Sequence, residues 1–195
     1  MNRRTYLAAV SVAGATSIAG CGAVPGGETL SDPTVNTESP GSKSLIFRSN
    51  DTEVGHFGVD GDANGDRIDL STEIWRQEGT RVESIKLRLW MPETTTESPA
   101  EVAVVSPVEG DSSPPPSVSL STPSRKPGTV IEVTDLDDLA DETISTLNLI
   151  VVPGLDTATD LNIDVTIDLS GGGVFSSGYT LDGELRLAYP ESPDQ

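Results

Sequence analysis

The residues best suited to chemistry form a short acidic stretch, DGDANGD, at residues 60–66. Its oxygen-bearing side chains alternate with small residues and belong to Asp60, Asp62, Asn64 and Asp66. Carboxylate and amide oxygens are the ligands that Ca²⁺ prefers, and glycines permit the tight turns that gather them. The stretch departs from the twelve-residue EF-hand loop, because neither starting frame has both the central glycine and the final glutamate. Two interpretations stay open: a looser calcium-binding β-turn, and an acidic hairpin turn without a metal, which we favour.

A second acidic pair depends on how the last two predicted strands meet. If they form an antiparallel hairpin with Leu169 opposite Tyr179, Asp164 faces Glu184 across the sheet. Like charges directly opposite destabilise a strand pair. Either high salt or a cation relieves them, or this register is wrong, and we rank salt first. Paired carboxylates can also hydrolyse glycosidic bonds. A hydrolase is therefore one hypothesis, although nothing else distinguishes these two residues among the 31 acidic ones.

The inventory of nucleophiles and soft metal ligands excludes several classes of site. His56 is the only histidine and Cys21 the only cysteine, so the chain lacks the ligand sets of zinc and blue-copper sites. The GxxxxGK(S/T) phosphate loop and the GxSxG motif are both absent from the sequence. Asn50 opens an Asn-Asp-Thr acceptor sequence for N-glycosylation. We expect a protein that is not an enzyme and has no cofactor apart from the calcium ion considered above.

The elements that position these side chains are expected to be strands, because apolar residues recur at every second position and no helical period appears. Long strands are expected at residues 67–75, 81–91, 161–169 and 179–189. Shorter strands are expected at Leu45–Phe47, Val54–Val59, Val102–Val105, Val118–Leu120, Val130–Val133 and Leu147–Val152. One turn of helix is expected within residues 135–143.

The strands at 67–75 and 81–91 are predicted to form a hairpin across the loop at 77–80. This register places Ile68 opposite Leu89 and matches apolar with apolar residues, which a slip of one residue would destroy. Many short strands separated by turn signals are typical of β-sandwiches and barrels. The predicted fold class is therefore all-β: an antiparallel, immunoglobulin-like β-sandwich, with a jelly roll or an open barrel as alternatives.

Charge is the most unusual property of the composition. Lys and Arg number 12 against 31 Asp and Glu, and the formal net charge is −19 at pH 7. Such a surface repels nucleic acid, whose binding depends on Lys and Arg contacts to phosphate. The negative charges also repel one another, which destabilises the folded state at low salt. Molar salt removes most of this destabilisation because it shortens the Debye length to about 3 Å. The composition predicts adaptation to high salt, with an acidic cation-binding surface in ordinary medium as the alternative.

The N-terminus has the pattern of an export signal. Basic residues precede a weakly apolar run that is shorter than the ~20 residues of a membrane span. The motif IAGC at residues 18–21 resembles the lipobox of prokaryotic lipoproteins, and RRTYL at residues 3–7 resembles the twin-arginine export signal. With the acidic composition, the N-terminal segment is similar to that of a haloarchaeal lipoprotein. This resemblance implies that Arg3 and Arg4 direct export and that Cys21 becomes the lipidated first residue.

These features divide the chain into four predicted segments. They are a signal peptide at 1–20, a lipid-anchored flexible tether at 21–42, a β-sandwich domain at 43–190 and a C-terminal tail at 191–195. The tether is expected because its segment is rich in Pro, Gly, Ser and Thr and lacks periodicity.

The segments and the composition lead to an expected location and function. We expect the domain at the outer face of the cytoplasmic membrane, attached through lipid on Cys21. Its expected role is non-catalytic: structural, or binding a ligand or a partner such as a surface-layer or other extracellular protein. A calcium-dependent adhesion module is the first alternative, and a carboxylate-based hydrolase is the less favoured one.

Overall fold

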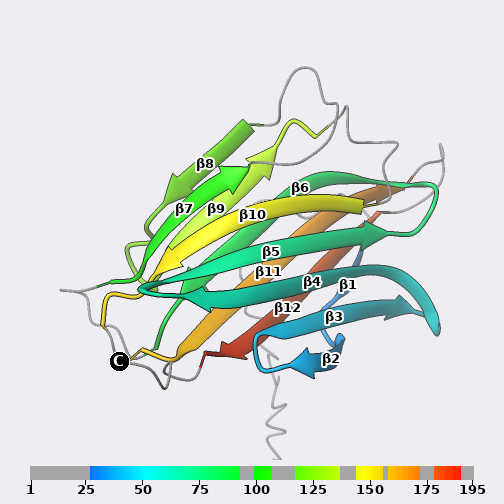
Figure 1. Ribbon diagram of the computed structural model, residues 1–195. Helices are drawn as coiled ribbons and strands as arrows, with labels where there is room; N and C mark the ends of the chain where they lie inside the picture. The colour runs from blue at the N-terminus through cyan, green and yellow to red at the C-terminus, as the bar shows by residue number, and fades with distance from the viewer. Residues whose placement is uncertain are drawn as a thin grey trace, which may run out of the picture.

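The computed structural model describes residues 27–92, 99–106, 117–136, 144–155, 158–171 and 178–189. All regular structure in these ranges is β-strand (Figure 1). The strands are β1 (Glu28–Leu30), β2 (Thr34–Ser39), β3 (Ser42–Ser49), β4 (Thr52–Asn64), β5 (Arg67–Arg76), β6 (Thr80–Trp90), β7 (Glu101–Ser106), β8 (Ser117–Ser121), β9 (Thr129–Thr134), β10 (Ile144–Val152), β11 (Asp160–Gly171) and β12 (Tyr179–Ala188). In the part of the chain so described, no helix is long and apolar enough to cross a membrane.

The strands form two six-stranded sheets that pack face to face (Figure 1). Sheet A has the order β1-β12-β11-β6-β9-β8, and sheet B has the order β2-β3-β4-β5-β10-β7. Neighbouring strands are antiparallel throughout these described sheets, except that β1 runs parallel to β12. Two layers of antiparallel strands, with a chain that crosses between them, are the layout of immunoglobulin-like sandwiches. The predicted fold class is confirmed.

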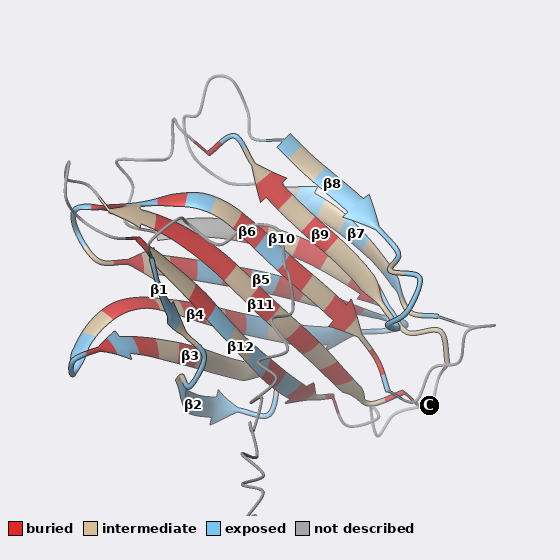
Figure 2. Ribbon diagram, turned by 180° about the vertical axis from the view of Figure 1, so that it is seen from behind, coloured by how far each residue is buried: buried red, intermediate tan, exposed pale blue. Residues whose placement is uncertain are grey.

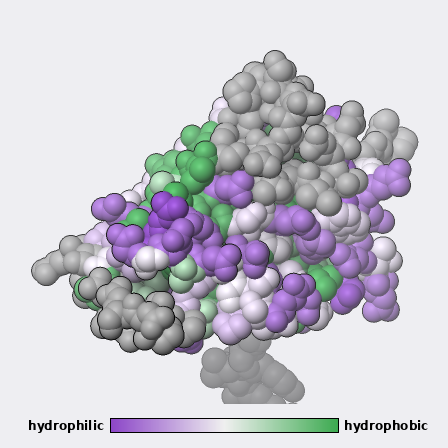
Figure 3. All heavy atoms as spheres, in the orientation of Figure 1, coloured by the Kyte–Doolittle hydropathy of each residue, from purple (hydrophilic) through white to green (hydrophobic). Residues whose placement is uncertain are grey.

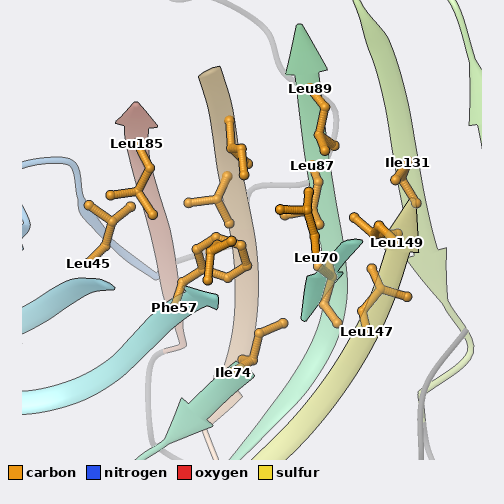
Figure 4. Packing of buried hydrophobic residues seen from close by; sticks show 14 of the residues in the cluster. Leu45, Phe57, Leu70, Ile74, Leu87, Leu89, Ile131, Leu147, Leu149 and Leu185 are labelled. Carbon is orange, nitrogen blue, oxygen red and sulfur yellow. The ribbon is translucent and has the colours of Figure 1, made fainter. Parts of the chain in front are cut away.

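The core lies between the two sheets and is built by the alternation seen in the sequence. Buried positions alternate with less buried ones along β6, β11 and β12 (Figure 2). Phe57 and Leu70 of sheet B point toward Leu87 and Leu185 of sheet A (Figure 4). The six shorter strands predicted from the sequence are confirmed as β3, β4, β7, β8, β9 and β10. Most of the segment in which a helical turn was expected, residues 137–143, lies outside the described residues.

The predicted hairpin between residues 67–75 and 81–91 is wrong. β5 lies in sheet B between β4 and β10, whereas β6 lies in sheet A between β11 and β9. Hydrogen bonds hold the corner between them: Arg76, which is 3% exposed, donates to the carbonyl of Thr80. The amide of Thr80 in turn donates to the carbonyl of Gln77 at 3.2 Å. The alternation of apolar and polar residues buries the same side chains whether β5 and β6 form a hairpin or lie in opposite sheets. The sequence pattern therefore could not distinguish these two arrangements.

The sandwich begins earlier than predicted. β1 pairs with β12, and the amide of Glu28 donates to the carbonyl of Gly178 at 3.0 Å, while β2 pairs with β3. The predicted tether through Ser42 therefore contributes two strands, and its boundary moves to before residue 27. These edge strands are short, and all six residues of β2 are exposed, so they show no buried apolar face in the sequence. Residues 1–26 and the predicted tail at 191–195 lie outside the described residues.

Candidate binding face on sheet B

The predicted calcium ligands lie at one end of the outer face of sheet B. Asp60, Asp62 and Asn64 belong to β4 and Asp66 to the turn after it, and all four are exposed. Alternate residues of a strand lie about 6.6 Å apart, whereas oxygens that bind Ca²⁺ lie about 2.3–2.6 Å from the ion. Asp60 and Asn64, the outermost of the three on β4, are twice that far apart along the strand. One ion therefore cannot take all four as ligands, because the strand spreads side chains that a loop would gather.

The stretch forms a tight hairpin turn. Asn64 pairs with Arg67, and Gly65 between them has φ +66°, the left-handed value that the first loop position of a type II′ turn requires. No three His, Cys, Asp or Glu side chains are placed for one metal ion in the described ranges. The stretch is thus a two-residue turn with acidic flanks, and calcium binding there stays a prediction.

Beside this turn, an open hollow of about 390 Å³ extends over β4, β5 and β10. Asp69 organises its polar side: it accepts a hydrogen bond from Nδ2 of Asn64 at 3.1 Å and pairs with Nε of Arg67 at 3.0 Å. The hollow is lined by Asp60, Asp62, Arg67, Asp69, Leu70, Ser71, Val105, Asn148, Leu149 and Ile150. The carboxylates of this hollow therefore lie beside apolar side chains. Such a lining would suit a partner group that has both a cationic and an apolar part.

A family model for a domain of unknown function, DUF8121, matches residues 27–191, which is most of the chain. The chain belongs to the DUF8121 family. The match begins one residue before β1, where the sandwich itself begins. No curated protein sequence matches the chain.

Among the solved structures that resemble the DUF8121 fold, two illustrate the low sequence identity of these matches. A cohesin module from a Clostridium perfringens family 33 glycoside hydrolase is 16% identical, with 72% of this chain and 100% of that chain covered and a TM-score of 0.41. The collagen-binding domain of a Staphylococcus aureus adhesin is 11% identical, with 67% and 95% covered and a TM-score of 0.38. Likeness at this level does not assign a function.

The other end of the same DUF8121 face carries a cluster that the sequence did not reveal. His56 of β4 lies opposite Trp75 of β5 and stacks on it, with ring centroids 5.7 Å apart and planes at 16°. Nδ1 of His56 is 3.2 Å from Oε1 of Glu53, and Nε2 is 3.3 Å from Oε1 of Glu73. The single histidine is therefore fixed by one ring and two carboxylates. Trp75 and Glu73 lie beside it through the β4–β5 register, which the sequence analysis did not predict, and Glu53 precedes it on β4.

The outer face of sheet A carries the predicted pair of opposed carboxylates. The register of β11 with β12 is confirmed, with Leu169 opposite Tyr179 and Asp164 opposite Glu184. Arg88 of the neighbouring β6 pairs with Asp164 and so offsets part of the repulsion, which the sequence did not predict. The two positions are correct, and relief by salt stays a prediction.

Arg88 makes a two-point contact with Asp164. Its Nε and Nη2 donate to Oδ2 of Asp164 at 2.8 and 2.5 Å, and its Nη1 donates to the carbonyl of Pro127 at 3.0 Å. The guanidinium carbon lies 3.7 Å from the ring centroid of Trp90, a cation–π distance. A carboxylate held in this way is poorly suited to act as a general acid or base, so the geometry does not favour a hydrolase that uses Asp164.

Tyr189 lies beneath the acidic end of β4, on the inner side. It is 8% exposed, and its hydroxyl has no hydrogen-bond partner among the described residues. A Cβ at Gly61 would lie 2.2 Å from that hydroxyl oxygen, so glycine is needed there. Burial, with the nearby charges of Asp60 and Asp62, raises the pKa of the Tyr189 phenol well above its ordinary value.

The raised pKa of Tyr189 leads to an alkaline stability prediction. In the unfolded chain the phenol ionises near its ordinary pKa of 10.0, whereas in the folded chain it stays protonated. The free energy of unfolding should therefore be unaffected by this group below pH 10 and fall above it, by up to ~1.4 kcal/mol per pH unit. Tyr189→Phe should remove that loss in denaturant titrations at successive pH values. Tyr179→Phe is the control, and an equal slope in both variants would contradict the assignment.

The predicted glycosylation site lies at the other end of sheet B. Asn50 is exposed at the tip of the β3–β4 hairpin, where it and Asp51 have φ of 49° and 66°, as a type I′ turn requires. The acceptor asparagine thus faces solvent, and its glycosylation stays a prediction. Cys21, Arg3 and Arg4 lie outside the described residues.

Proposed function

We propose that this DUF8121 chain is a non-catalytic module of the cell surface, with a structural or partner-binding role. Lipid on Cys21 holds it at the outer face of the cytoplasmic membrane, after export directed by Arg3 and Arg4. Its partner is a surface-layer or other extracellular protein, and the net charge of −19 disfavours nucleic acid. The lipobox-like motif and the acidic composition support this proposal.

The observation that carries the proposal is the separation between the end where the chain enters the sandwich and the acidic hollow. At this entry, the backbone amide of Glu28 donates a hydrogen bond to the carbonyl of Gly178. The Glu28 carboxylate accepts one from Oγ of Ser49 at 2.7 Å. From that end, β4 runs 13 residues to Asn64, which is roughly 40 Å. The hollow therefore lies far from the N-terminal entry, at the end that a domain anchored through its N-terminus would present outward.

The short distance in sequence between the lipobox and the first strand also supports the proposal. Six residues lie between Cys21 and Glu28, and even a fully extended chain over these seven Cα–Cα steps spans at most about 25 Å. Lipid on Cys21 would keep the entry end near the membrane and leave the far end of sheet B open to a partner.

Replacing Cys21 tests the anchor. In a host that processes such signals, the natural chain should sediment with the membranes in molar KCl, because lipid holds it there. Cys21→Ser should shift the protein to the soluble or medium fraction, measured by fractionation and immunoblotting, since a hydroxyl cannot take the thioether-linked lipid.

A relocated thiol is the matched control for the anchor. The double variant Cys21→Ser/Ser31→Cys keeps one cysteine but moves it to the exposed stretch between β1 and β2. It should be released like the single variant if the lipobox position matters. Retention of Cys21→Ser on the membrane would overturn the proposed anchor, and retention of the double variant alone would show that any exposed thiol suffices.

A further inference from the structure

β8 is an unusual edge strand for so acidic a chain. Among the described strands it pairs only with β9, so half of its backbone N–H and C=O groups point away from sheet A. Its sequence, Ser-Val-Ser-Leu-Ser, contains no charged residue and no proline. Proteins that stay monomeric usually protect such an edge with charge or proline. The protection expected at Ser117–Ser121 is missing.

Apolar side chains are exposed along this side of the sandwich. Leu120 is 48% exposed even though its β9 neighbour across the sheet, Ile131, is fully buried in the core. Val105 of β7, at the matching edge of sheet B, is 61% exposed. Figure 3 shows apolar surface gathered over the β7 and β8 side, while much of the remaining visible surface is hydrophilic.

The sequence of β8 is complementary to itself. If two copies pair antiparallel about a two-fold axis at Ser119, Ser117 meets Ser121 of the second copy and Val118 meets Leu120. The apolar residues of both copies then share the inner face and continue the core, while serines meet on the outer face. A two-fold interface requires this kind of self-matching surface.

Charges at the two ends of the β8–β9 hairpin fit the same arrangement. Arg125 and Lys126 are exposed in the loop after β8. Asp135 lies at the opposite end, where it accepts a hydrogen bond from Oγ of Ser117 at 2.5 Å. Antiparallel pairing of two copies places the cationic end of each hairpin beside the acidic end of the other, so the charges at the interface complement each other.

We propose that the protein forms a symmetric dimer in which β8 pairs with β8 of a second copy, joining the two A sheets into one. The two copies each carry a net charge of −19, so long-range repulsion opposes association at low salt. Salt at about 1 M screens that repulsion while leaving backbone pairing and apolar contact intact. The dimer therefore forms preferentially in high salt, and this inference does not depend on the lipid anchor.

Sedimentation velocity on the full chain tests the dimer. All variants share Cys21→Ser, so that neither lipid nor a disulfide can join copies. The parent should sediment as a dimer in about 1 M KCl and shift toward monomer in about 0.1 M KCl. Leu120→Lys places one cation on each side of the two-fold axis, opposite Val118 of the other copy, and should raise the dissociation constant at least ~10-fold. Circular dichroism confirms that each variant remains folded.

Val35→Lys is the matched control, because Val35 is 53% exposed on β2, the opposite edge of the molecule. It should leave the dimer unchanged. A second pair of variants tests the end charges: Arg125→Glu/Lys126→Glu should weaken the dimer, and adding Asp135→Lys should restore part of it. A monomeric parent at both salt concentrations would overturn the proposal, as would a Leu120→Lys protein that dimerises like the parent.

Discussion

Gly61→Ala should lower the free energy of unfolding by about 3 kcal/mol, the upper range for an overpacked core. The added methyl would lie 2.2 Å from the hydroxyl oxygen of Tyr189 and 2.6 Å from a methyl of Leu70. Gly61 belongs to β4, a central strand of sheet B with partners on both sides, so the backbone cannot move away without breaking a ladder. Chemical denaturation measures the loss.

Gly58→Ala is the control for this prediction. It lies in the same strand, but its added methyl would meet nothing closer than Cβ of Glu73 at 3.8 Å, an ordinary contact. The change should be nearly neutral or stabilising by up to ~1 kcal/mol, because the unfolded chain loses freedom. Tyr189→Phe should recover part of the loss in Gly61→Ala, since it removes the closest contact. Equal losses for Gly58→Ala and Gly61→Ala would show that the tyrosine does not set the requirement for glycine.

Arg88→Ala should lower the free energy of unfolding by about 2–3 kcal/mol. The variant loses both hydrogen bonds to Asp164 and the contact with Trp90, and it leaves Asp164 opposite Glu184 with no arginine beside it. Part of the loss is repulsion between carboxylates, so it should be larger in about 0.1 M salt than in about 1 M. Thermal or denaturant unfolding at the two salt concentrations measures both effects.

Arg186→Ala is the comparison on the same sheet face. Arg186 pairs with Asp160 at 2.6 Å, but its side chain is 66% exposed, whereas that of Arg88 is 14% exposed. An exposed ion pair contributes little, so the loss should stay below about 1 kcal/mol. If the two arginine variants lose the same stability, burial and the opposed carboxylates are not what makes Arg88 important.

The long strands and the β11–β12 hairpin could be predicted because apolar and polar residues alternate along them. In β11 and β12 the strands are adjacent in sequence and lie in one sheet, so matching apolar faces also fixed the register of Leu169 with Tyr179. The same reasoning failed for β5 and β6. There Ile68 and Leu89 face the core from opposite sheets, and nothing in the alternation shows which sheet a strand joins.

The parts of the candidate site that depend on neighbours in space were not accessible from the sequence. Asp60 and Asp62 were predicted as possible calcium ligands in a turn, whereas the structure places both along β4, whose length the sequence did not show. The stacking of His56 on Trp75 follows from the β4–β5 register. The room that Gly61 leaves for Tyr189 links residues far apart in the chain, and no local pattern signals it.

The parallel pairing of β1 with β12 also determines how the domain responds to mechanical load. A pull transmitted from residues before 27 enters the fold through a strand of only three residues. That strand contributes Leu30, which is only partly buried, and none of the fully buried residues of the core. Under tension β1 should detach first and lengthen the connection slightly while the eleven other described strands keep their packing. We therefore expect a pull on the N-terminus to separate β1 from β12 before it disturbs the core.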